Sequence, residues 1–152
     1  MGEAKIRFGM GRVYRDAAAE ARRCGDRRVS TEHLALAMLS DADSVTARAL
    51  GVSLDSARTA LRDLDSEALA TVGIEASFDG PVLAGRPNER LRLTPSARAV
   101  FAGLRQEADG ERLSIRHVLL ALLRHERPDP AAELFDALGV DRGAVRDRLR
   151  TA

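Results

Sequence analysis

The segment STEHLALAML at residues 30–39 recurs as SIRHVLLALL at residues 114–123. In both copies a serine is followed three positions later by a histidine, and a mostly apolar run follows the histidine. Serine is a favoured N-cap residue, so each copy predicts a helix that begins directly after its serine. Both predicted helices are apolar nearly all round, which is typical of helices that are buried on several sides. The chain therefore contains two equivalent central helices.

The similarity extends in both directions along the chain. Upstream, Glu20 and the alanine after it match Glu107 and the alanine after that; downstream, GVSLDSARTALR at residues 51–62 matches GVDRGAVRDRLR at residues 139–150. An internal repeat of this length indicates a duplicated structural unit. We therefore predict two repeats, at residues 1–70 and 93–152, and a linker rich in Gly and Pro at residues 71–92.

Each repeat is expected to form four helices. Apolar residues recur at three- and four-residue steps, and no segment alternates convincingly with a period of two, so we expect no substantial sheet. Thr94 followed by proline is a strong helix start, and Gly25, Gly51 and Gly139 are expected helix stops. The predicted helices cover about 10–24, 31–40, 44–50 and a segment after Ser53 in the first repeat, and about 95–108, 115–124, 130–138 and 141–150 in the second.

These helices predict an all-α protein. Two central helices, each surrounded by three amphipathic helices, form two four-helix repeats related by a pseudo-twofold axis and packed as one eight-helix globule. The core is aliphatic, because aromatic residues make up only 3% of the chain.

The composition excludes several classes of protein. The single cysteine, Cys24, rules out a disulfide within the chain and fits a reducing cytoplasm. No stretch approaches the roughly 18 uncharged apolar residues of a membrane span. Lys5, the only lysine, does not lie in a Gly-Lys-Ser/Thr motif, so the chain has no P-loop for ATP. The net charge of +1 gives no strong attraction to nucleic acid or to anionic lipid.

His33 and His117 are the repeated polar residues of the two central helices. They could be a metal pair or general bases, but a pseudo-twofold fold would keep them apart, so we favour histidines of the first helical turn that bond to loop backbone. Cys24 and His33 could form a nucleophile and its base. The arginines around Cys24 could instead contact nucleic acid, although they lack interleaved aromatic residues and a known motif.

The order of the motifs resembles that of a known family. The chain carries TEHL at 31–34, GVSL at 51–54 and LTP at 93–95, within two copies of one unit. This arrangement resembles the double Clp N-terminal repeat, the N-domain of unfoldases of the ClpA, ClpB and ClpC type, and is most similar to the ClpC branch. The resemblance covers essentially the whole chain. It implies an all-helical domain that binds substrates or adaptor proteins.

The ClpC branch also implies two pockets for phosphorylated arginine. In each, the Glu of the TEH motif pairs with the guanidinium, and the Thr that opens the first helix of the same unit helps to hold the phosphate. The first unit keeps Thr31 and Glu32 but has Arg7 at the position of the phosphate-binding Thr, where the arginine could still hold a phosphate. The second unit keeps Thr94 but has Arg116 in place of the Glu, which would repel a guanidinium. The second pocket is therefore expected to be lost.

Phe8 and Phe78 are further candidates for ligand contacts. They are either core residues or the border of a groove between the units, a groove that takes hydrophobic peptides in this family, including peptide antibiotics in its actinobacterial members. Aromatic side chains in such pockets carry much of the binding energy.

We therefore predict a cytoplasmic, non-catalytic protein-binding module without metal or cofactor. Its expected partners are Clp adaptors, degrons or substrates, with phosphoarginine or cyclic peptides as narrower ligands. The chain fits both a segment of a larger unfoldase and a freestanding paralogue, which could act as an adaptor or as a decoy for peptide ligands. A small Cys/His enzyme and an arginine-driven nucleic-acid binder are the alternatives from other classes.

Overall fold

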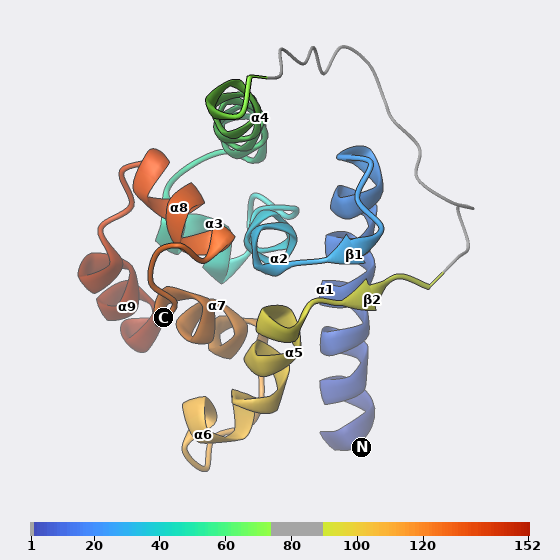
Figure 1. Ribbon diagram of the computed structural model, residues 1–152. Coiled ribbons are helices and arrows are strands. Elements are labelled where there is room, and N and C mark those ends of the chain that lie inside the picture. Colours follow the sequence, from blue (N-terminus) through green and yellow to red (C-terminus); the bar gives the residue numbers. More distant parts are fainter. Residues whose placement is uncertain (1, 74–89) are drawn as a thin grey trace.

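Helices make up most of the part of the chain that the structure describes. The computed structural model describes the backbone of residues 2–73 and 90–152, and the side chains of residues 10–73 and 90–152 (Figure 1). The helices are α1 (Gly2–Arg23), α2 (Thr31–Ala37), α3 (Val45–Leu50), α4 (Leu54–Thr71), α5 (Pro95–Ala102), α6 (Leu104–Ala108), α7 (Ile115–Leu123), α8 (Pro130–Ala137) and α9 (Arg142–Thr151). The all-α prediction is confirmed.

Short polar residues and glycines set the ends of these helices. The hydroxyl of Ser44 accepts a hydrogen bond from the N–H of Ala47 at the start of α3, and Ser53 caps α4 in the same way. These side chains satisfy N–H groups that the first turn of a helix leaves without a partner. Gly51 ends α3 with a φ of 69°, a left-handed conformation that glycine adopts without steric cost.

The two central helices are buried, as their sequences predict. Figure 1 shows α2 and α7 in the middle of the fold, with the other helices around them. Their apolar side chains form the centre of the core: Leu34, Leu36, Met38, Val118, Leu119, Leu122 and Leu123 are all fully or almost fully buried. An aliphatic core of this kind holds the two repeats together by burial of apolar surface.

Two helices differ from the prediction. The helix expected over 95–108 is divided at Gly103, so the described residues form nine helices and not eight. Glycine lowers helix stability by about 1 kcal/mol relative to alanine, which favours a break at this position. At the other end of the chain, α1 begins at Gly2 and not near residue 10.

Helices of each repeat pack against helices of the other repeat. In each repeat the third helix packs against the fourth helix of the other repeat: α3 contacts α9, and α8 contacts α4. The central helix α2 also contacts α8. The core of each repeat is therefore completed by the other.

A short parallel strand pair adds a second link between the repeats. Strand β1 (Arg28–Val29) precedes α2, and strand β2 (Arg92–Leu93) precedes α5. Val29 lies opposite Leu93, and the N–H of Thr94 donates to the carbonyl oxygen of Val29 over 2.9 Å. The starts of α2 and α5 consequently lie side by side (Figure 1).

Candidate functional site

The repeated histidines cap the helices on which they lie. The backbone N–H of Ser30 donates to Nδ1 of His33 over 2.9 Å, and the N–H of Ser114 donates to Nδ1 of His117 over 3.0 Å. In each case the serine and the histidine form a capping box, in which the histidine takes the place of the usual Glu or Gln. The prediction that both histidines bond to loop backbone is confirmed.

His33 also lies beside a cysteine and two carboxylates. Its Nε2 is 2.9 Å from Oδ2 of Asp26 and 3.8 Å from Oε1 of Glu32. Burial lowers the pKa of His33, whereas hydrogen bonds to Asp26 and Cys24 and the charge of Glu32 raise it, to about 10. A ring with protons on both nitrogens could no longer accept the N–H of Ser30. The hydrogen bond from Ser30 and a second ring proton therefore compete for Nδ1 of His33.

The capping role argues against metal or base chemistry at His33. The ligand atoms of Cys24, Asp26 and His33 lie within 4.8 Å of one another, close enough to surround a cation. In a neutral His33, however, Nδ1 accepts from Ser30, so the ring proton is on Nε2. That nitrogen then has no lone pair for a metal ion or for the proton of a thiol, and metal-bound histidines normally donate from the other ring nitrogen.

Thr31, a residue of the predicted phosphoarginine pocket, is not exposed at the start of its helix. Its side chain is fully buried, with 0% of its surface exposed. Its hydroxyl donates to Oδ1 of Asp129 over 2.9 Å and accepts from the N–H of Ala131 over 3.2 Å. The TEH threonine thus joins the first repeat to the start of α8 in the second.

Glu32 occupies an acidic region between α2 and α4. Its Oε2 atom is buried and has no hydrogen-bond partner among the described residues. On α4, partial burial and the charges of Asp26 and Glu32 raise the pKa of Asp65 to about 6. The carboxylate of Glu32 therefore has one acceptor oxygen without a partner among the described residues, beside the cationic His33 and the acidic Asp65.

Thr94 lies beside the segment that carries Glu32, although the two residues come from different repeats. The hydrogen bond from Thr94 to Val29 places it next to the turn that leads into α2. The resemblance instead paired Thr94 with position 116 of its own repeat. There Arg116 forms an ion pair with Glu111 and donates to the carbonyl oxygen of Leu149 over 3.4 Å. Thr94 thus lies beside Val29, three residues before Glu32, and its helix α5 contacts both central helices.

Three other predicted contacts lie outside the described residues. These are the side chains of Arg7 and Phe8, and the whole of Phe78. The backbone of Arg7 and Phe8 lies within α1, so neither residue opens that helix. Their roles in binding stay predictions.

An apolar hollow of about 520 Å³ lies between α1 and the β2–α5 segment. Tyr14 is fixed at its edge, because its hydroxyl donates to the carbonyl oxygen of Leu91 over 2.7 Å and the guanidinium of Arg90 lies 5.2 Å from the centre of its ring. The sequence predicted a groove between the units with Phe8 and Phe78 at its border, but it did not point to Tyr14, the only tyrosine in the chain. Its other lining residues are Met10, Gly11, Arg15, Leu93 and Phe101.

The arrangement of the helices matches a solved structure. The N-terminal domain of the caseinolytic protease associated chaperone ClpD from Arabidopsis thaliana superposes with a TM-score of 0.69, over 92% of this chain and 91% of that chain. The chain has the fold of a Clp N-terminal domain. The two sequences are 18% identical, so the similarity concerns the fold of the Clp N-domain and not its ligands. No protein-family model matches the sequence, and a search of curated proteins found no match.

Among the described residues, no helix combines the length and the hydropathy that a membrane span requires.

Proposed function

We propose that this chain is a non-catalytic module that binds peptide segments of other proteins, with adaptors or substrates of a Clp protease as its partners. The observation that carries the proposal is the apolar hollow between α1 and the β2–α5 segment, on a Clp N-domain fold. Both repeats line it, so it lies at the junction where the helices and strands of the two units meet. A concave apolar site with a few polar groups is typical of ligand binding.

The charges at the hollow favour an acidic segment of the partner. Met10, Leu93 and Phe101 supply apolar surface, while Arg15 and Arg90 are cationic and exposed. An extended peptide with apolar side chains and a nearby carboxylate complements this combination. Arginine at the rim also increases the rate of encounter with an acidic partner.

A direct test uses labelled casein as an unfolded, acidic probe. We expect Arg15→Glu to weaken binding several-fold, and Phe101→Ser to weaken it further, because apolar contacts in a pocket carry more energy than a rim charge. The matched control is Arg48→Glu, which makes the same charge change at an exposed position of α3. Equal binding by all three variants and the unmodified chain would exclude the hollow as the site.

The buried, unpaired carboxylate oxygen of Glu32 and the helix start at Thr94 support a narrower ligand, phosphoarginine, at one site and not two. An unused carboxylate oxygen can accept from a guanidinium. Thr94 precedes the N-terminus of α5, where backbone N–H groups and the helix dipole favour a phosphate. Arg116 is engaged with Glu111 and offers no carboxylate for a second guanidinium.

Calorimetric titration with free phosphoarginine tests this ligand. We expect Glu32→Gln to weaken binding by roughly tenfold or more, as a charge-assisted hydrogen bond is lost. Arg116→Gln, at the matching position of the second repeat, is the control and should bind like the unmodified chain. Absence of binding at millimolar phosphoarginine would exclude the ligand and leave the casein test unaffected.

A further inference from the structure

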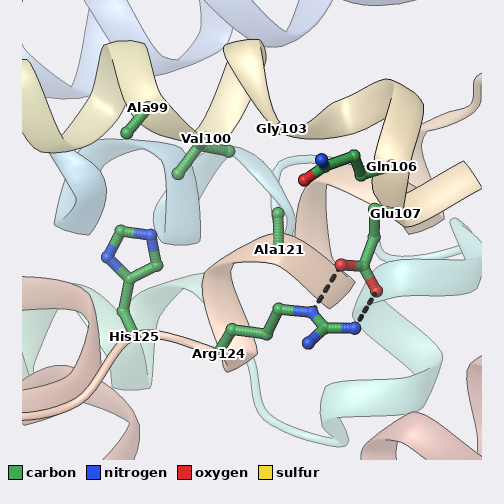
Figure 2. A pocket seen from close by; sticks show the side chains of 8 residues that line it. All are labelled: Ala99, Val100, Gly103, Gln106, Glu107, Ala121, Arg124 and His125. Atoms are coloured by element: carbon green, nitrogen blue, oxygen red, sulfur yellow. Dashed lines mark hydrogen bonds and ion pairs between the residues drawn. The ribbon is translucent and has the colours of Figure 1, made fainter.

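A second hollow, of about 490 Å³, lies in the second repeat between α5, α6 and the end of α7. Figure 2 shows His125, Arg124, Glu107 and Gln106 around it, with Ala121 on the α7 side and Ala99 and Val100 on α5. It is distinct from the hollow beside α1, with which it shares no lining residue. Its walls combine small apolar residues with charged side chains.

The internal repeat explains why space is open here. Matching Glu20 with Glu107 aligns Arg12 with Ala99 and Asp16 with Gly103. Two long or polar side chains of the first repeat thus correspond to a methyl group and a hydrogen atom in the second. Gly103 is also the residue at which the second repeat divides its first helix into α5 and α6.

In the first repeat the corresponding positions form an exposed polar network. The hydroxyl of Ser40 donates to Oδ2 of Asp16 over 2.9 Å, and Nε of Arg12 lies 3.9 Å from the same oxygen. The position of Ser40 matches Arg124 in the second repeat, from the alignment of the central helices. The second repeat therefore lacks the side chains of Arg12 and Asp16 and has a cation, Arg124, at the position of Ser40.

The polar groups around the hollow are held in place but not fully used. Glu107, with 12% of its side chain exposed, accepts from Nε of Arg124 over 2.5 Å and from Nη2 over 3.4 Å. Nδ1 of His125 is 3.1 Å from Oδ2 of Asp129, an acceptor, so Nδ1 carries a proton. Among the described residues, Nη1 of Arg124, Nε2 of His125 and the amide of Gln106 make no hydrogen bond with protein.

We propose that this hollow binds a carboxylate of a peptide together with a small apolar group next to it. The carboxylate accepts from Nη1 of Arg124 and from the amide of Gln106, and a backbone N–H of the peptide donates to Nε2 of His125. Ala99, Val100 and Ala121 receive a methyl-sized side chain. The C-terminus of a peptide and an acidic side chain carry the same chemistry.

The local charge favours a carboxylate over a phosphate. Arg124 and Glu107 carry opposite charges that cancel, so a carboxylate leaves an excess of one negative charge at the site and a doubly charged phosphate leaves an excess of two. A doubly charged phosphate would face the carboxylate of Glu107 without a second fixed cation among the lining residues. The inference does not depend on the proposed function, because it uses a different hollow and different residues.

The test is an NMR titration of the full chain, with the amide signals of Gly103 and Ala121 as reporters. The probes are N-acetyl-Ala-Ala with a free carboxylate, the same dipeptide as an amide, N-acetylglutamate amide, and inorganic phosphate. We expect saturable shifts with the free dipeptide and roughly tenfold weaker binding of its amide form. N-acetylglutamate amide shows whether a side-chain carboxylate also enters.

Two variants locate the binding site. Arg124→Gln removes the cation, and the double variant Ala99→Arg with Gly103→Asp restores the side chains of the first repeat; both should weaken binding about tenfold or more. Arg105→Gln, an exposed arginine of α6 outside the hollow, is the matched control and should bind normally.

Several results would overturn the inference. They are equal binding of the acid and the amide, phosphate binding at least as tight as the dipeptide acid, and unchanged binding by the filled double variant. A dipeptide acid that produces no shift at millimolar concentration would also overturn it, whatever the casein and phosphoarginine experiments show.

Discussion

The hydroxyl of Thr31 donates to Oδ1 of Asp129, a residue 98 positions later in the chain, over 2.9 Å. The same hydroxyl accepts the N–H of Ala131 in the first turn of α8. The buried side chain of Thr31 therefore links the two repeats by hydrogen bonds.

Replacing Thr31 by valine should destabilise the fold by about 1–2 kcal/mol, because the change leaves buried polar groups of α8 with fewer partners at nearly constant volume. Asp129 also accepts from the N–H of Ala131, over 3.0 Å, which limits the loss. Urea unfolding followed by circular dichroism measures the difference. Thr59→Val, at an exposed position of α4, is the control and should leave the midpoint almost unchanged.

The packing of helices between the repeats predicts that neither repeat folds alone. Residues 1–73 lack α8 and α9, against which α4 and α3 pack, and residues 90–152 lack the reverse contacts. Each fragment would expose the apolar faces that the other covers. We expect each fragment to show weak helical circular dichroism and an equimolar mixture to recover much of the signal. A fragment that unfolds cooperatively by itself would contradict this.

The buried ion pair between Glu20 and Arg58 should be costly to break. Nη2 of Arg58 is 2.6 Å from Oε1 of Glu20, and the side chain of Glu20 is 6% exposed. Glu20→Gln leaves a partly buried guanidinium with only the exposed carboxylate of Asp55 as counter-charge, and we expect a loss of about 3 kcal/mol in the free energy of unfolding. Asp55→Asn removes a 95% exposed partner of the same arginine, so its effect should be small. Equal effects of the two changes would show that burial of the pair does not matter.

Asp65 predicts a pH dependence of stability. Its pKa in the folded protein is raised from 3.8 to about 6, by partial burial and by the charges of Asp26 and Glu32. A raised carboxyl pKa favours the folded state below pH 3.8, and this contribution is lost as the pH rises to about 6. Asp65→Asn should therefore raise stability more at pH 7 than at pH 4. Urea unfolding at both values checks the sign, with Asp63→Asn on the same helix as the control.

The features of the fold that depend on local sequence were predictable. Ser30 and Ser114 start the central helices, and Gly51 ends α3, because capping and left-handed glycine involve only neighbouring residues. The break at Gly103 was missed, since the apolar period continues through residues 95–108 and one glycine does not always interrupt a helix.

The pairing of residues between repeats was not predictable from the sequence. The two repeats carry the same local patterns, so periodicity cannot show which segments of one repeat contact the other, such as the backbone of Thr94 and that of Val29. The burial of Thr31 has the same cause, because it depends on α8 packing against α2. The hollow at Gly103 was not predictable either, because the sequence alone does not show that Asp16, at the matching position of the first repeat, bonds to Ser40.

The unequal repeats have a consequence for binding stoichiometry. A duplicated scaffold suggests two equivalent ligands per molecule, yet Glu32 has Arg116 as its counterpart, and the space beside Gly103 corresponds to a polar network around Asp16. Within the part of the chain that the structure describes, each of these surfaces therefore occurs in one repeat and not in the other. Titrations of this protein should accordingly saturate at one ligand per molecule for each type of ligand, although its architecture is double.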